Sequence, residues 1–267
     1  MKTLSYLRIV APSLALPAVA FLLLASIHPR PVKASTLPRL VCGTDTFAFN
    51  GTAESLAGVH TNGPAIVGGV EIFNLDFPLN GITPAFGHIV SGQPEVVGDD
   101  AGNTLRELAD FGPPHILTTV PPGSNSFSAS CCNEQMVQAP DGKFYHAHYG
   151  DVIQQLGLQS GQSMVLQTFP QTDVVGMASD GVSIWITNWD NKQVGTWDPA
   201  ANVFTPVFST PSNAGGLAWD IANGVLWVGM QGGSVIPYDA TGKQLGNGFQ
   251  PFGSISGTVD GLAFVPQ

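Results

Sequence analysis

Short apolar runs separated by glycine-containing turns recur along most of the chain. Residues 217–229 read LAWDIANGVLWVG, and residues 56–68 read LAGVHTNGPAIVG. In each segment an Asn-Gly pair divides two apolar runs, which is typical of a β-hairpin. Residues 136–147 and 177–188 repeat the pattern with an Asp-Gly pair. The alternation of runs and turns therefore predicts antiparallel hairpins.

These segments start at a nearly constant interval. With a weaker copy at 97–105 and a truncated one at 262–267, the starts lie 39 to 45 residues apart, at Leu56, Val97, Met136, Met177, Leu217 and Leu262. Residues 194–208 and 235–249 have the pattern of a second hairpin within a repeat. Four short strands in about 40 residues are the blade unit of a β-propeller.

The two ends of the repeat region complement each other. The last copy supplies only a first strand, while residues 40–54 resemble the later part of a blade. Five full blades and one blade shared between the termini predict an all-β, six-bladed β-propeller with four-stranded blades of about 40 residues. A β-sandwich is the structural alternative, but it does not predict a constant period.

The composition excludes some classes of function. Of the 267 residues, 43% are hydrophobic and only 10% are charged, so the chain can bury a core and is not disordered. The formal net charge is −10. Because phosphate binding needs a basic surface, this excess of acidic residues argues against a nucleic-acid partner. A small molecule, or an extracytoplasmic protein or glycan, is the expected partner.

The first 34 residues have the pattern of a secretory signal peptide. Lys2 and Arg8 precede an apolar run over 9–27, and small residues at 32 and 34 precede a cleavage point at Ser35. We therefore expect residues 1–34 to be removed and 35–267 to form one propeller domain. That domain would be secreted or periplasmic, monomeric and free of the membrane. The run is long enough to span a bilayer, so an N-terminal membrane anchor is the alternative.

Signal removal would sharpen the charge. It leaves five basic and nineteen acidic residues, a net charge of −14. Part of this excess recurs at one position of the repeat, two residues before each start, where the chain has Glu54, Glu95, Glu134, Val175, Gly215 and Asp260. Asn213 lies close to the same position.

First strands line the channel of a propeller, so these acidic residues would form a ring around one axis. Converging carboxylates repel one another and need either a cation or raised pKa values. Oxygen ligands suit Ca²⁺, or Mg²⁺ with retained waters. The predicted metal ligands are Glu54, Glu95, Glu134, Asp260 and Asn213. The alternative is that these are solvated loop residues.

The loops between second and third strands open on the same side. They contribute His146, His148 and Tyr149 from one repeat, and Asn188, Trp189 and Asp190 from the next. Because side chains alternate along a strand, His146 and His148 point the same way and could bind metal or act as a general base. The alternative is a pair of ordinary surface histidines. Tyr149, Asn188, Trp189 and Asp190 are the predicted ligand-facing residues.

The chain has three cysteines. Cys131 and Cys132 are adjacent, and in an oxidising compartment they could form a vicinal disulfide; the alternative is two reduced thiols. Cys42 would be buried in the closing blade. Trp185, Trp219 and Trp227 sit within repeat strands and are expected in the core.

Several of these motifs carry a family resemblance. Asp-Gly-Leu-Ala at 260–263, Gly-Leu-Ala-Trp at 216–219 and Asn-Gly-Val-Leu-Trp-Val at 223–228 resemble the six-bladed propellers of the streptogramin B lyase, NHL and gluconolactonase/senescence-marker groups. The resemblance implies a propeller fold. From the gluconolactonase-like group it also implies a divalent metal held at strand starts, with Asp260 the best match and Glu54 or Glu134 and Asn213 looser ones. The lyase group implies a His acting with Mg²⁺.

The C-terminus carries a second resemblance. Residues 255–266 are similar to the end of exported bacterial propellers that continue into a Pro-Glu-Pro sorting tail, which this sequence lacks.

Two functions fit these observations. The first is an exported binding or interaction module with a divalent cation at its channel. The second is a metal-dependent hydrolase or lyase that acts on a small ester or lactone at the same site. Fold alone does not choose between them.

Overall fold

A computed structural model describes residues 37–43, 55–74, 80–84, 96–100, 104–108, 116–120, 133–148, 152–159, 162–171, 173–254 and 257–265. All regular structure within these residues is β-strand. None of them belongs to a helix that could cross a membrane. The predicted signal peptide lies outside the described residues.

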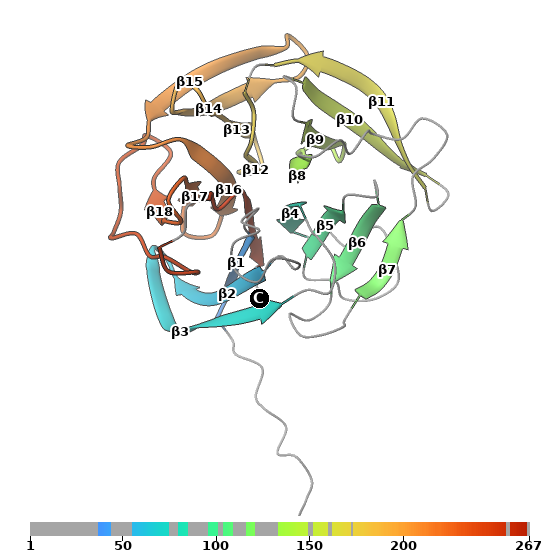
Figure 1. Cartoon of the computed structure of the whole chain (residues 1–267). Coiled ribbons are helices and arrows are strands. Elements are labelled where there is room, and N and C mark those ends of the chain that lie inside the picture. Colours follow the sequence, from blue (N-terminus) through green and yellow to red (C-terminus); the bar gives the residue numbers. More distant parts are fainter. Residues whose placement is uncertain are drawn as a thin grey trace, which may run out of the picture. The chain divides into compact units, whose positions relative to one another are not determined.

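The two ends of the propeller region meet in one antiparallel sheet. Its strand order is β19-β1-β2-β3, with bounds Gly261–Val265, Arg39–Gly43, Ser55–Asn62 and Ala65–Asn74. Cys42 in β1 is opposite Leu262 in β19. The C-terminal strand therefore occupies the first position of a sheet whose other strands come from the N-terminal side, as the repeat pattern predicts (Figure 1).

The remaining sheets follow the chain in order. The second sheet has β4 (Asn80–Pro84), β5 (Val96–Asp100), β6 (Thr104–Leu108) and β7 (Ile116–Val120). The third has β8 (Asn133–Gln138), β9 (Phe144–His148), β10 (Val152–Gln159) and β11 (Gln162–Pro170). The fourth has β12 (Met177–Ser179), β13 (Ile184–Asn188), β14 (Gln193–Asp198) and β15 (Val203–Ser209).

The fifth sheet has three full strands. These are β16 (Ala214–Asp220), β17 (Val225–Met230) and β18 (Val235–Tyr238). Two isolated bridges, Val235 with Phe249 and Tyr238 with Gln244, align residues 244–249 along the outer edge of β18. This segment takes the place that a fourth strand has in the other sheets.

The first strands of the five sheets contact one another in a closed cycle. β4 contacts β8, β8 contacts β12, β12 contacts β16, β16 contacts β19, and β19 contacts β4. The described part of the chain is therefore an all-β ring of antiparallel sheets, consistent with propeller blades (Figure 1).

The number of sheets in this part differs from the predicted count of six. Met136, Met177, Leu217 and Leu262 do lie in first strands, but Leu56 lies in β2 and Val97 in β5. An Asn-Gly or Asp-Gly turn identifies a hairpin without saying which pair of blade strands it joins. The hairpin that starts at Leu56 is formed by β2 and β3, the outer pair of the closing sheet. The repeat copies at Leu56 and Leu262 therefore belong to the same blade.

Apolar side chains fill the spaces between sheets. Trp185, Trp219 and Trp227 are all buried, which confirms their predicted place in the core. Between the third and fourth sheets, the rings of Tyr145 and Phe169 each lie 5.2 Å from Trp197 in edge-to-face geometry. Edge-to-face aromatic pairs add about 0.5–1.5 kcal/mol each to the gain from burial.

Cys42 is buried in the closing sheet, as expected, and has no disulfide partner among the described residues. Burial raises the pKa of its thiol, because the charged thiolate loses its hydration. A protonated, enclosed thiol is a packing group rather than a nucleophile.

Candidate functional site

The amide of Gln135 occupies the axis of the ring. Gln135 follows Glu134 in β8 and is fully buried. Its Oε1 accepts the backbone N–H of Met177 at 3.1 Å and that of Leu217 at 2.6 Å. Its Nε2 donates to the backbone carbonyls of Leu217, at 2.5 Å, and Leu262. One side chain therefore links four first strands: β8, β12, β16 and β19.

These four bonds exhaust the hydrogen-bonding capacity of the amide. A glutamine offers two N–H groups and one oxygen with two lone pairs, and all are used. The inner edge of each first strand presents backbone N–H and C=O groups that would be costly to bury unpaired. Gln135 satisfies both kinds at once without adding a charge.

Close backbone contact explains why the chain has a glycine, and no acidic residue, at position 215. A Cβ added at Gly176 would lie 2.1 Å from the carbonyl oxygen of Gly215, and one at Gly215 would lie 2.5 Å from that of Val259. A side chain at Gly176 or Gly215 would therefore collide with the backbone of the neighbouring sheet. The hydroxyl of Thr187 accepts the backbone N–H of Gly176 at 2.7 Å and supports this turn of the chain.

The predicted metal ligands divide into two groups. Glu54 and Glu95 lie outside the described residues, and the strands that follow them, β2 and β5, are not first strands. Glu134 in β8 and Asp260, directly before β19, do lie at the start of first strands. Asn213 precedes β16, and its backbone carbonyl accepts the N–H of Gln231 at 3.0 Å.

No group of three or more His, Cys, Asp or Glu residues arranged to hold a metal occurs among the residues that the structure describes. The side chain of Glu134 is outside this set. The cation site therefore stays a prediction, carried by Glu134, Asp260 and Asn213.

The interpretation of His146 as a surface histidine is wrong. Its side chain is fully buried in β9, and burial lowers its pKa to about 3 because the imidazolium loses its hydration. His148 pairs with Asn133 in β8, and its side chain lies outside the described set.

The predicted ligand-facing residues lie partly in a tight turn. Asn188 ends β13, is buried, and accepts the N–H of Asn191 at 3.0 Å through its Oδ1. The N–H of Trp189 donates to the carbonyl of Asp173 at 2.7 Å, which places this turn beside the start of β12, as predicted. Asp190 is exposed. Tyr149, Cys131 and Cys132 lie outside the described residues.

A second set of acidic residues was not recognised in the sequence. Five hairpin turns each contain an aspartate whose carboxylate accepts backbone N–H groups of that turn; these are Asp141, Asp180, Asp198, Asp220 and Asp239. All five turns join a first strand to a second or a third to a fourth. Because first strands run the same way around the axis, the turns share one side, which we call the turn face.

Hydrogen bonding favours the charged form of two of these carboxylates, Asp141 and Asp239. The pKa of Asp141 is lowered, mainly by its contact with Lys143, and that of Asp239 is lowered mainly by the hydroxyl of Thr241. A turn signal such as Asp-Gly-Lys at 141–143 identifies a hairpin, but only the ring shows that the turns gather on one face. Part of the negative charge of the chain is therefore fixed there.

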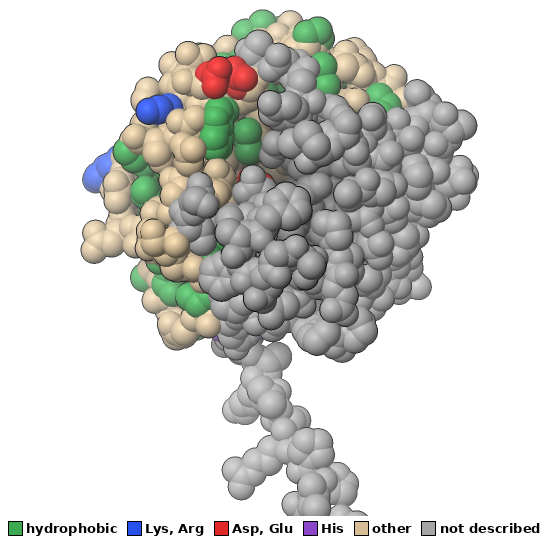
Figure 2. Space-filling model, viewed as in Figure 1, with side chains coloured by type: hydrophobic (Ala, Val, Ile, Leu, Met, Phe, Trp, Pro, Cys, Tyr) green, Lys and Arg blue, Asp and Glu red, His purple; other side chains and the backbone are tan. Residues whose placement is uncertain are grey.

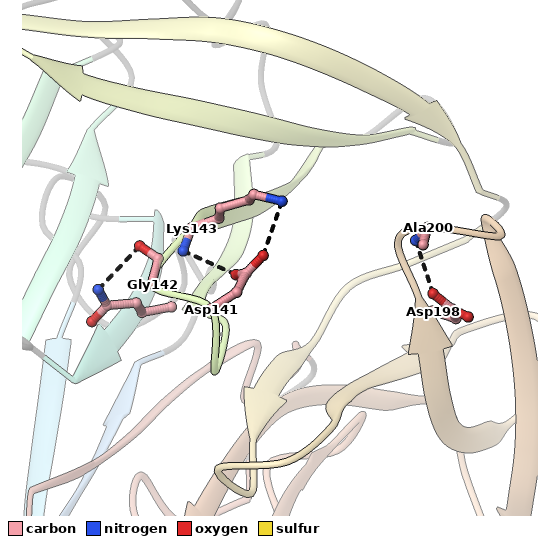
Figure 3. Close-up of polar contacts among 6 residues, drawn as sticks. Asp141, Gly142, Lys143, Asp198 and Ala200 are labelled. Carbon is pink, nitrogen blue, oxygen red and sulfur yellow. Dashed lines mark hydrogen bonds and ion pairs between the residues drawn. The ribbon is translucent and has the colours of Figure 1, made fainter.

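A pocket of about 590 Å³ opens on the turn face. It lies between the β8–β9, β12–β13 and β14–β15 turns, and much of its wall is apolar, including Val182, Ile184, Trp197 and Val203. Asp141 and Asp198 are its two acidic residues. Figure 3 shows them on separate turns, and Figure 2 shows acidic side chains beside hydrophobic ones on the face in view.

The two carboxylates of the pocket differ in their partners. Asp141 forms an ion pair with Lys143, with 2.9 Å between Oδ2 and Nζ. Asp198 is exposed, and its Oδ1 accepts the N–H groups of Ala200 at 2.8 Å and Ala201 at 3.3 Å. The geometry leaves Oδ2 of Asp198 as an acceptor at the rim.

Comparison with known proteins supports the fold. No protein-family model and no curated protein sequence matches the chain. A chain of the nidogen/laminin complex aligns with a TM-score of 0.53 at 12% identity, over 85% of this chain and 98% of that one. A protein of unknown function from Bacteroides caccae also aligns at 0.53, with 9% identity, over 87% of this chain and all of its own. The chain therefore has a β-propeller-like fold.

Proposed function

We propose that this chain is an exported binding module that recognises a partner at the ends of its sheets. The observation that carries the proposal is the saturated amide of Gln135 at the axis. An enzyme that used the channel would need reactive groups and room for a substrate at this level. The axis instead holds a neutral side chain with no free donor or acceptor.

Two further observations support a binding role. The buried, neutral His146 is unsuited to general-base catalysis on a dissolved substrate. The turn face offers a pocket with apolar walls and fixed charges, and such surfaces suit recognition. Propeller-like neighbours are consistent with an interaction module, although fold alone does not assign function.

The test is a comparison of binding with turnover. Residues 35–267 are purified and applied to peptide and glycan arrays, and in parallel to a panel of lactones and small esters with Ca²⁺ or Mg²⁺. We expect a ligand to be retained unchanged and no turnover in the panel. Turnover that is lost in EDTA and in Glu134→Gln would contradict the proposal and support the alternative, a metal-dependent hydrolase or lyase.

A divalent cation at the mouth of the channel is the second part of this proposal. Glu134, Asp260 and Asn213 would provide oxygen ligands for Ca²⁺, or for Mg²⁺ with retained waters, with Glu54 and Glu95 as further candidates. The measurement is metal analysis of the purified protein, together with melting in EDTA and in added Ca²⁺. A bound metal and a lower melting temperature in EDTA are expected. Absence of both would remove the cation site and leave the binding role in place.

Export is the third part. Cleavage before Ser35 would follow from the signal pattern of residues 1–34. N-terminal sequencing of the protein recovered outside the cytoplasm should therefore begin at Ser35. A chain that retains Met1 and sediments with membranes would instead support the anchor.

A further inference from the structure

The pocket on the turn face exposes large apolar side chains. Val182 is 85% exposed and Val203 is 51% exposed, and both line the pocket beside the indole of Trp197. Exposed apolar side chains that share one wall of a pocket are typical of a binding surface. This wall would shield the methylene stem of a long side chain.

The rim of the pocket carries negative charge that is available to a ligand. Lys143 already neutralises Asp141, whereas the two backbone N–H groups that bond to Asp198 both donate to its Oδ1. Oδ2 of Asp198 can therefore accept from a donor outside the chain. A guanidinium or ammonium group on an apolar stem matches an acidic rim above an apolar wall.

The charge of the whole chain favours the same class of ligand. The net charge is −10, and five aspartates lie in the turns of this face, so a cationic group is attracted and an anionic one repelled. A metal ion is a poorer match, because Asp198 is the one pocket carboxylate that is not paired with a lysine.

The surroundings of the pocket favour a peptide segment over a free amino acid. Val203 and Thr205 line the pocket and belong to β15, the outermost strand of its sheet. An extended segment could lie along this edge, as in recognition by strand addition. The volume of about 590 Å³ accommodates a basic side chain together with its neighbours.

We propose that the pocket formed by turns 139–143, 180–183 and 198–203 binds an arginine or lysine side chain presented by an extended segment of a partner protein. The proposal rests on the binding role proposed above and gives it a location and a ligand chemistry.

The experiment titrates acetyl-Val-Arg-Val-amide into ¹⁵N-labelled protein and follows backbone amide shifts. The same peptide with citrulline, which keeps the shape of arginine without its charge, is the ligand control. Shifts should concentrate in the three pocket turns, and the citrulline peptide should bind more weakly. The variant Asp198→Asn keeps Oδ1 for the turn but removes the charge, so affinity should fall about fivefold, as for an exposed ion pair.

The chain offers a matched control. Asp239 caps a turn on the same face through the same type of bond, from its Oδ1 to the N–H of Thr241 at 2.8 Å, but does not line the pocket. Asp239→Asn removes the same charge and should change affinity less than 1.5-fold at about 0.15 M salt, where distant charges are screened. Val182→Ser, at an exposed position that the fold does not need, should also weaken binding.

Three results would overturn the proposal. These are equal affinity for the citrulline peptide, equal losses in Asp198→Asn and Asp239→Asn, and no shifts in the pocket turns at millimolar peptide. A ligand found on the arrays that binds Asp198→Asn as well as the native chain would reject this pocket while leaving the binding module intact. Turnover of a lactone or ester would instead reject the proposed function.

Discussion

At the scale of single residues, the Gln135 side chain connects four strands that are far apart in the sequence. Its amide joins backbone groups that are 42, 82 and 127 residues away in the chain. This role requires a side chain that is uncharged as well as one of the right shape. Oε1 faces two N–H donors and Nε2 faces two carbonyl acceptors. A side chain whose two terminal atoms are both donors or both acceptors would therefore leave one of these two pairs without hydrogen bonds.

Gln135→Glu tests this directly. The new carboxyl would face the carbonyls of Leu217 and Leu262, so its charged form is disfavoured and its folded pKa is raised above the ordinary value of about 4.3. The folded state then holds a proton that the unfolded state releases, so stability falls as pH rises through that interval. Urea unfolding from pH 4 to 8 should show this fall in the variant relative to the native chain. Parallel pH profiles would contradict the role of Gln135.

His146 gives a pH dependence of the opposite sign. Its folded pKa is about 3, while an unfolded histidine titrates near 6.5. The unfolded state therefore binds a proton between these values and the folded state does not, so stability falls as pH is lowered from 6.5. In His146→Leu this component should be absent. Melting temperatures measured from pH 7 to 5.5, where most carboxylates stay ionised, compare the two slopes; equal slopes would show that His146 is not buried.

At the scale of elements, the turns were the most predictable feature. Asp141-Gly142, Asp180-Gly181 and Asn223-Gly224 all lie in hairpin turns, with the three glycines at positive φ, which glycine adopts readily because it has no Cβ. The order of the hairpins within the blades was not predictable, since inner and outer hairpins share the same local pattern. The long-range hydrogen bonds of Gln135 and the grouping of the turn aspartates on one face were not predictable either. Both depend on how the sheets are arranged in the ring, which the local sequence pattern does not report.

The turn that precedes β15 also connects two sheets. Asn202, at φ 52°, accepts from the side chain of Gln171 at 2.7 Å and from the indole N–H of Trp197 at 3.1 Å, and it donates to the carbonyl of Pro170 at 3.1 Å. It thereby holds the end of β11 against the β14–β15 turn. No Asp-Gly or Asn-Gly pair marks this position.

Asn202→Ala should destabilise the protein by about 2 kcal/mol, because it strains a left-handed residue and leaves the buried indole N–H of Trp197 without its acceptor. Asn202→Asp keeps that acceptor and tolerates the same φ, so it should lie between the native chain and Asn202→Ala. Chemical denaturation gives the order. Equal losses in the two variants would mean that the Oδ1 contacts contribute nothing.

At the scale of the whole molecule, ring closure depends on the last strand. β19 contributes the first strand of the closing sheet, contacts β4 and β16, and provides the Leu262 carbonyl to Gln135. Truncation after residue 260 should therefore prevent cooperative folding, because it opens the ring and exposes the edge of β1. Removal of 266–267 alone, beyond β19, is the control. Circular dichroism and thermal melting distinguish them; a truncated chain that melts like the native one would contradict closure by β19.

The ring also gives the acidic charge of the chain two locations. Glu134 and Asp260 lie at the starts of first strands, and the turn aspartates lie at the other end of the sheets. The amide of Gln135 is fully hydrogen-bonded beside the first group, whereas a pocket opens between the turns. We therefore place the proposed recognition on the turn face.

Hydrogen exchange at the axis is the most direct test of this account. The N–H groups of Met177 and Leu217 donate to Gln135, and Ile221 is exposed in the β16–β17 turn. If the amide fills the axis, the Met177 and Leu217 amides exchange only on global unfolding, while Ile221 exchanges rapidly. Exchange at Met177 and Leu217 as fast as at Ile221 would show an open, water-filled channel and contradict the account.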